Sequence, residues 1–272
     1  MTGPPLVAVA HGSRDPRSAA TAAALVDVVR ALRPGLDVRL AFLDLSAPRL
    51  GDVLAAVHGR GHGGEHGRGY GATHGRGHGE AVVVPLLLGS AYHATVDLPG
   101  AVRDAVARLP RLRVRLADVL GPDPRLSSAA LRRLAAAGAR LDDPGLGVVL
   151  AAAGSSHRPA NAAVEAVAAG WSRRAPWVGA RAAFAAAAAP SVPEAIASLR
   201  ARGARRIAVA PWFLAPGRLL DRVTSAARAT DPDVLVAEPL GADPEVAQLV
   251  LERYAAVDGV SPSTTIAALV GL

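Results

Sequence analysis

The sequence predicts an α/β fold with two similar domains, each an open, parallel, four-stranded sheet with helices on both faces. Two observations favour this fold. Short apolar runs alternate with alanine-rich stretches of helical length, which is the pattern of parallel βαβ units. The same order of motifs also occurs twice along the chain. With 272 residues and a hydrophobic content of 51%, the chain can fill the cores of two domains.

Each half is expected to consist of strands and helices in strict alternation. The strands are the short apolar runs, such as LVAVA at the start of the chain, and the helices are the alanine-rich stretches between them. In the first half we expect strands at 6–10, 37–42, 81–87 and 112–117, and helices near 17–32, 48–57, 97–108 and 125–138. In the second half we expect strands at 147–152, 178–184, 206–210 and 233–237, and helices near 160–172, 192–202, 219–229 and 244–256.

Paired motifs, one from each half, indicate an internal duplication. The pairs are VAVAHGS at 7–13 with VLAAAGS at 149–155, AFLDLSAP at 41–48 with AFAAAAAP at 183–190, VVVPLLL at 82–88 with IAVAPWFL at 207–214, and ADVLGPDP at 117–124 with AEPLGADP at 237–244. Between the halves, near 138–146, GARLDDPGL supplies the Gly, Asp and Pro that are typical of a helix end. We therefore expect an N-terminal domain at 1–140 and a C-terminal repeat at 145–260.

The composition excludes several kinds of catalysis. The chain has no cysteine and no lysine, so its 30 positively charged side chains are all arginine. Without lysine there is no phosphate-binding loop of the GxxxxGK[ST] type and no Schiff base to a pyridoxal cofactor. Without cysteine there is no thiolate nucleophile, disulfide or cysteine-ligated iron–sulfur cluster. An enzyme of this composition would work with histidine, carboxylate, arginine and backbone groups.

The net charge of +7 suggests an anionic partner, either nucleic acid or an acidic small molecule. Aromatic residues make up only 3% of the chain and no nucleic-acid-binding motif is recognisable, so we expect no nucleic-acid partner. An arginine-rich, solvated surface without a partner is the alternative interpretation of the charge.

The apolar runs are all shorter than the ~20 residues that span a bilayer. The N-terminus lacks the basic start, long apolar middle and cleavage site of an export signal. We therefore expect a cytoplasmic protein with no membrane partner.

Histidine and carboxylate side chains follow the first three expected strands. His11 follows the first strand, Asp44 ends the second, and His93 lies in the loop after the third. Ligands of open parallel sheets bind beyond the carboxyl ends of the strands, and these residue types suit a divalent metal or a general base near neutral pH. The alternative is that they are ordinary loop residues, with Asp44 capping a turn. The matching positions of the second half hold Ala153, Ala186 and Arg218 or Leu219, as expected of a duplicated protein with one active site.

The motifs around these residues resemble those of the class II tetrapyrrole chelatases, specifically the sirohydrochlorin chelatases. The motifs are AHGSRDP at 10–16, AFLDLSAP at 41–48 and VVVPLLLGSAYHATVDLP at 82–99, together with AGSSHRP and PWFLAPG in the second half. The similarity covers nearly the whole chain. The family usually has glutamate where this sequence has Asp44, whose side chain is one methylene shorter.

The resemblance implies a lyase-type chelatase that inserts iron(II) or cobalt(II) into sirohydrochlorin without ATP, in a cleft between two chelatase-type domains. The metal is a substrate, and no organic cofactor is implied. His11 and His93 would hold the metal and accept pyrrole protons, and Asp44 would tune or complete the coordination. The carboxylates of the ring fit a basic protein. The expected substrate-binding residues are Ser13, Arg14, Tyr92, Ser155 and Ser156.

The stretch 58–79 is an insertion in this pattern, because a connection between a helix and a strand usually needs only a few residues. HGRG occurs in it three times, and its ten glycines among 22 residues disfavour a fixed fold. Imidazoles on such a segment bind divalent metals, so it is either a collector or store of metal for the cleft or low-complexity filler. The accessory metal-handling histidines are His58, His62, His66, His74 and His78.

Iron insertion for sirohaem synthesis is the leading hypothesis, and cobalt insertion for cobalamin synthesis would use the same groups. A non-catalytic metal-binding or storage protein that uses the histidine repeat is an alternative of another class. The combination of His11, Asp44 and His93 disfavours it. His157 and Arg218 are expected to lie on the surface or to contact a substrate carboxylate.

Overall fold

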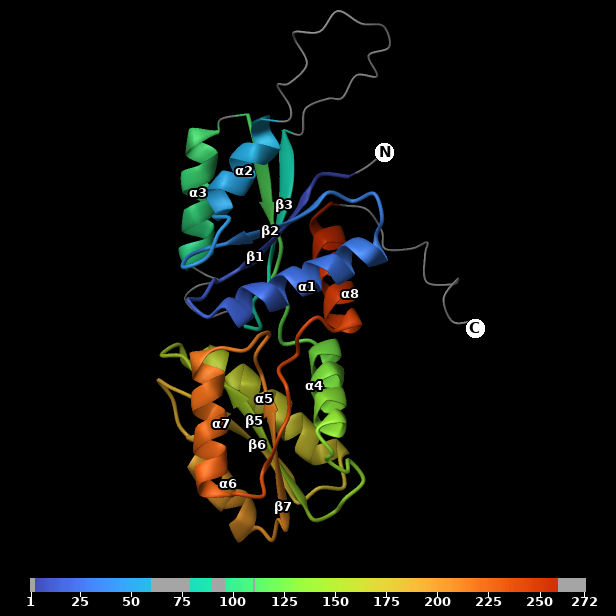
Figure 1. Cartoon of the computed structure of the whole chain (residues 1–272), viewed down its shortest axis with the longest axis vertical. Helices are drawn as coiled ribbons and strands as arrows, with labels where there is room; N and C mark the ends of the chain where they lie inside the picture. Colours follow the sequence, from blue (N-terminus) through green and yellow to red (C-terminus); the bar gives the residue numbers. More distant parts are fainter. Residues whose placement is uncertain (1–2, 60–78, 90–95, 110, 259–272) are drawn as a thin grey trace, which may run out of the picture.

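The computed structural model describes residues 3–59, 79–89, 96–109 and 111–258, which form two four-stranded sheets of parallel strands (Figure 1). The strand order is β2-β1-β3-β4 in the first sheet and β6-β5-β7-β8 in the second. The first half contains β1 (Leu6–Ala10), α1 (Pro16–Leu32), β2 (Val38–Phe42), α2 (Leu50–Gly59), β3 (Glu80–Pro85), α3 (Leu98–Arg108), β4 (Arg113–Leu116) and α4 (Pro124–Ala136). The second half contains β5 (Leu146–Ala152), α5 (Arg158–Arg174), β6 (Gly179–Phe184), α6 (Val192–Ala201), β7 (Arg206–Pro211), α7 (Arg218–Thr230), β8 (Leu235–Val236) and α8 (Pro244–Asp258).

The predicted fold class is confirmed, and every expected strand and helix is present. The last strand is shorter than expected, since we expected 233–237 and the structure has only Leu235–Val236. This strand is at the edge of its sheet and pairs with β7 alone, so it has only one neighbour to extend it. The expected division into domains at 1–140 and 145–260 stays a prediction.

The central strands of both sheets are apolar because they are buried on both faces, as parallel strands covered by helices must be. Every residue of β5 is buried, and so are the first four of β1. α2 and α3 cover one face of the first sheet, and α6 and α7 cover one face of the second. The remaining face of each sheet belongs to one hydrophobic cluster that runs through both halves of the molecule.

The last helix of each half packs on the sheet of the other half. α4 contacts β7 of the second sheet, whereas α8, at the end of the chain, contacts β3 and α1 (Figure 1). Tyr254 of α8 is fully buried, and its hydroxyl donates to the carbonyl of Pro4 at 2.8 Å. In the opposite direction, Arg132 of α4 donates to the carboxylate of Asp243 at 2.8 Å. This exchange of helices joins the two sheets firmly, so loops from both of them can line one site.

Of the helices that the structure describes, none has both the length and the apolar character needed to cross a membrane.

Candidate active site

The loop after β1 holds His11 against the loop after β2. The backbone N–H of Asp44 donates to the carbonyl of His11 at 2.9 Å. Gly12 has a φ of 95°, and a β-carbon there would lie 1.6 Å from the carbonyl oxygen of Asp44. Only glycine therefore fits between the two loops, and this close contact fixes the backbone on which the half-buried His11 side chain is placed.

Ser46 joins the same two loops through its hydroxyl group. The hydroxyl accepts from the backbone N–H of Ser13 at 3.1 Å and donates to the carbonyl of Ser13 at 2.9 Å. The Ser13 hydroxyl accepts from the N–H of Asp15 at 3.0 Å, and Asp15 in turn caps α1 by accepting from the N–H of Arg17. Ser13 therefore has an ordered backbone, and its hydroxyl still has a proton to donate.

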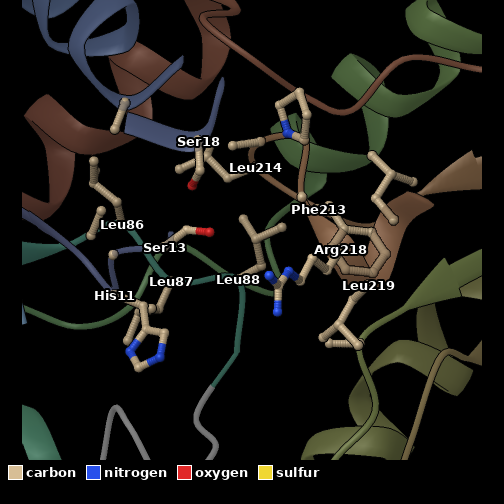
Figure 2. A pocket seen from close by; sticks show the side chains of 18 of the residues that line it. His11, Ser13, Ser18, Leu86, Leu87, Leu88, Phe213, Leu214, Arg218 and Leu219 are labelled. Atoms are coloured by element: carbon tan, nitrogen blue, oxygen red, sulfur yellow. The ribbon is translucent and has the colours of Figure 1, made fainter. Parts of the chain in front are cut away.

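A cavity of about 600 Å³ lies between the two halves, and His11 lines it. The first half contributes the loops after β1 and β3, and the second half contributes the loop after β7 and the start of α7. The cavity is thus at the carboxyl ends of the strands, where parallel sheets bind ligands. In Figure 2, Arg218 extends from the second half toward the middle of the cavity, on the other side from His11 and Ser13.

The ionisable side chains that line the described part of this cavity are of the basic residue types. They are His11, Arg14 and Arg218, and most of the remaining lining is apolar. Asp15, the residue that caps α1, is ion-paired with Arg17 at 2.6 Å, and this pairing lowers the pKa of the Asp15 carboxyl, with Arg218 adding to the effect. The cavity therefore suits a ligand that is both apolar and negatively charged.

Arg17 also connects the two halves beside the cavity. Its guanidinium lies 2.6 Å from the carboxylate of Asp221 on α7, and hydrogen bonds to Asp15 and Asp221 raise its pKa. All of these groups lie near the surface, so the pair contributes little to stability. It shows that α1 and α7 approach each other at the edge of the cavity.

The backbone of Asp44 is hydrogen-bonded to that of His11, but the Asp44 carboxylate does not line the cavity. The carboxylate accepts from the guanidinium of Arg49 at 2.7 Å. The backbone N–H of Leu45 and then Arg49 lower the pKa of Asp44, and His11 contributes to the same shift. Asp44 is therefore ionised at neutral pH, and its predicted role as a metal ligand stays a prediction.

Tyr92 and His93 lie outside the described residues. The strand before them, β3, pairs with β1, and the N–H of Leu86 donates to the carbonyl of Val9 at 2.8 Å. The loop that carries His93 therefore begins beside the loop that carries His11. Among the residues that the structure describes, no group of three or more His, Cys, Asp and Glu side chains is arranged to hold a metal ion.

The described residues that flank the histidine repeat, Gly59 and Gly79, lie at the amino ends of the strands of the first sheet. His62, His66, His74 and His78 lie outside the described residues, whereas His58 is half-buried in the last turn of α2. The segment returns at Gly79, immediately before β3 begins. A strand of the six residues of β3 is about 20 Å long, so the described ends of the repeat lie roughly that far from the carboxyl-end loops. The repeat's role in metal handling stays a prediction.

The equivalent loops of the second half have the same backbone without the ionisable groups. The N–H of Ala186 donates to the carbonyl of Ala153 at 3.0 Å, and Gly154 has a φ of 83°. Ser155 lines a second cavity of about 220 Å³, which shares Leu87, Leu88, Ala153 and Trp212 with the first. Ser156 is exposed and lines neither cavity. Of the two predicted serines, only Ser155 therefore lies near the cavities.

Sequence reasoning did not single out several apolar residues that line the larger cavity. Leu45 and Leu86 to Leu88 come from the first half, and Trp212 to Leu214 come from the second. The pairing of VVVPLLL with IAVAPWFL contained the relevant signal, because both motifs run past the end of a strand into the loop that follows it.

Two duplicated parallel sheets, joined by exchanged helices and facing one cavity beside a strand-end histidine, have the architecture of the class II chelatases. The model of the CbiX family matches residues 5–137 and 147–257. The chain therefore belongs to the CbiX family, which confirms the resemblance drawn from its motifs.

Three solved structures are similar over almost the whole chain. SirB from Bacillus subtilis with Fe3+ has 24% identity and a TM-score of 0.72, covering 93% of this chain and 94% of that one. The sirohydrochlorin chelatase SirB from Bacillus subtilis subspecies spizizenii, in complex with cobalt, has 24% identity and a TM-score of 0.70 over the same shares. CbiX, the terminal enzyme for biosynthesis of siroheme in denitrifying bacteria, has 23% identity and a TM-score of 0.62, covering 93% and 98%. At these identities the similarity establishes the fold. No curated protein matches the sequence.

Proposed function

We propose that this chain is a sirohydrochlorin chelatase that inserts iron(II) into the metal-free ring, without ATP, to give sirohaem. The observation that carries the proposal is the basic and apolar cavity of about 600 Å³ between the halves, lined by His11, in a chain of the CbiX family. The related SirB and CbiX structures support it, because one contains iron and another is described as an enzyme of siroheme biosynthesis.

The lining of the cavity matches the two chemical parts of such a substrate. The ring is flat and apolar, and Leu86, Leu87 and Leu88 offer an apolar surface from the first half. The acid groups at the edge of the ring can accept hydrogen bonds from Arg14 and Arg218, neither of which makes a hydrogen bond or ion pair within the described part of the chain.

The reaction exchanges two pyrrole N–H protons for one divalent ion, so the site needs a group that holds the ion and groups that accept protons. A neutral imidazole at His11 has a nitrogen lone pair that can serve either purpose. The ionised Asp44 is the second candidate and His93 the third. Because Arg49 holds the Asp44 carboxylate, ligation by Asp44 would exchange that ion pair for the metal.

The test is the rate of metal insertion by the full chain carrying His11→Ala. We expect a loss of at least ~100-fold, the lower end of what a positioned proton acceptor contributes. The measurement is the absorbance change of sirohydrochlorin with iron(II) under anaerobic conditions. The matched control is His157→Ala, since His157 occupies the corresponding loop of the second half and is exposed. An insertion rate in His11→Ala equal to that of the parent would refute the proposal.

Cobalt insertion is the second candidate, and the observation that favours it is the SirB structure that contains cobalt. The same assay with cobalt(II) in place of iron(II) ranks the two metals. Binding of either metal without any change in the absorbance of the ring would instead indicate the storage protein.

A further inference from the structure

Leu45 is held in a backbone conformation that leucine disfavours. Its φ is 60°, and the N–H of Ser46 donates to the carbonyl of Asp44 at 2.7 Å, closing a three-residue turn around Leu45. In the described part of the chain, the other non-glycine residue with a positive φ is Ala187, at 59°. Side chains with a β-carbon adopt this region at a cost, so the surrounding structure must hold Leu45 there.

The turn at Leu45 is fixed to the loop of His11. The N–H of Asp44 donates to the carbonyl of His11, and the hydroxyl of Ser46 binds both backbone groups of Ser13. The residues on either side of Leu45 are therefore hydrogen-bonded to the loop that carries His11. The position of Leu45 relative to His11 is determined by the backbone.

The side chain of Leu45 is exposed at the cavity instead of being buried in a core. It is 44% exposed, one of two large hydrophobic residues so exposed among the described residues, and it lines the cavity together with His11. Leu86, Leu87 and Leu88, from the loop after β3, line the same cavity. An exposed leucine next to other apolar groups at a site indicates an apolar ligand surface.

The second half shows what the turn itself requires. Ala187 is at the equivalent position of the duplicated chain, with the same φ, and it lines neither cavity. The strained backbone is therefore a property of the duplicated fold, and an alanine satisfies it. The leucine side chain is present only in the half that carries His11, so the requirement for it comes from the site.

We propose that Leu45 is a ring-contacting residue that positions the tetrapyrrole macrocycle beside His11. This inference rests on the proposed function and assigns separate roles to the residues that line the cavity. Leu45 and Leu86 to Leu88 contact the apolar ring, while Arg14 and Arg218 bind its acid groups. Leu45 would thus select for a flat apolar macrocycle over a small acidic ligand.

The experiment uses three variants of the full chain: Leu45→Ala, Leu45→Met and Ala187→Leu. Because Ala187 already occupies this turn, alanine at position 45 is compatible with the backbone, and thermal unfolding should begin at the parent temperature. Four quantities are measured: the Kd for metal-free sirohydrochlorin by fluorescence, the KM for the ring, the KM for the metal, and kcat.

Leu45→Ala should raise the Kd and KM for the ring by roughly 15- to 60-fold, the loss expected when two or three buried methyl or methylene groups are removed. Its kcat and its KM for the metal should change by less than about twofold, which is far smaller than the change expected in the KM for the ring. Leu45→Met should restore parental values because methionine supplies a similar apolar volume. Ala187→Leu, the matched control, should change none of these quantities.

A parental KM for the ring in Leu45→Ala would overturn the inference, and so would a loss confined to kcat. A parent chain that neither binds nor metallates the ring would instead refute the proposed function, so the two failures are distinguishable.

Discussion

The two halves of the molecule share a backbone but differ in the side chains at the ends of their strands. After β1 and after β5, a glycine with positive φ packs against the next loop, and the same N–H to carbonyl bond follows it. The first half places His11 and Asp44 at these positions, and the second places Ala153 and Ala186. The duplicated fold therefore does not require the ionisable groups, which indicates that they serve chemistry.

The two loops are also anchored differently. Ser13 is held by the hydroxyl of Ser46, which comes from the neighbouring loop, whereas the N–H of Ser155 donates to the side chain of Asn161 on its own helix at 3.0 Å. Ser46 has an alanine, Ala188, as its counterpart in the second half. Anchoring to a neighbouring loop restricts two segments at once. The half with His11 therefore has the more constrained site.

The largest effect is expected from substituting the glycines of the two loops. A β-carbon at Gly12 would lie 1.6 Å from the Asp44 carbonyl oxygen, and one at Gly154 would lie 1.9 Å from that of Ala186. Each alanine variant should lower the free energy of unfolding by about 3 to 5 kcal/mol, since the backbone must move. Denaturant unfolding measures this loss.

The rate of metal insertion by the folded fraction of each glycine variant then compares the two loops directly. Gly12→Ala displaces His11 and should lose most of this rate, whereas Gly154→Ala should retain more of it. Equal loss in both variants would show that the two loops contribute equally to chemistry.

The second half should contribute binding of the ring through Arg218. Arg218→Ala should raise the KM for sirohydrochlorin by about tenfold, the value of one charge-assisted hydrogen bond, and leave the KM for the metal unchanged. The effect should shrink at high salt because an exposed guanidinium is screened. Arg222→Ala, one turn further along α7, is the control. A change in the KM for the metal would contradict a role in ring binding alone.

The sequence predicted the order of the elements well because apolar periodicity reports burial directly. It also placed His11 and Asp44 at adjacent strand ends, since the carboxyl ends of parallel strands meet at one edge. The exchange of α4 and α8 was not predictable, because an amphipathic helix shows that one face is buried but not which sheet covers it. The left-handed conformation of Leu45 gave no signal either, because the sequence has no glycine there to indicate it.

The smallest effect is expected from the charge of Asp44. Its pKa is lowered by the Leu45 N–H and by Arg49, so its folded-state pKa is below the ordinary value of 3.8. A lowered pKa means that the ionised carboxylate stabilises the fold above pH ~4, and that this contribution is lost as the pH falls through the folded-state pKa. Asp44→Asn removes the charge and keeps an acceptor for the N–H. Since Asp44 and Arg49 are exposed, the Tm should fall on the order of 1 °C at neutral pH.

The difference in Tm between Asp44→Asn and the parent should shrink as the pH falls below 3.8 and through the lowered folded-state pKa of Asp44, and thermal unfolding at several pH values checks this. Ala186 explains why the effect is small: the same turn forms there without any carboxylate. A large loss of stability in Asp44→Asn would mean that Asp44 is retained for the fold. A small loss of stability together with slower metal insertion would place its purpose in the reaction, where the comparison between the two halves already points.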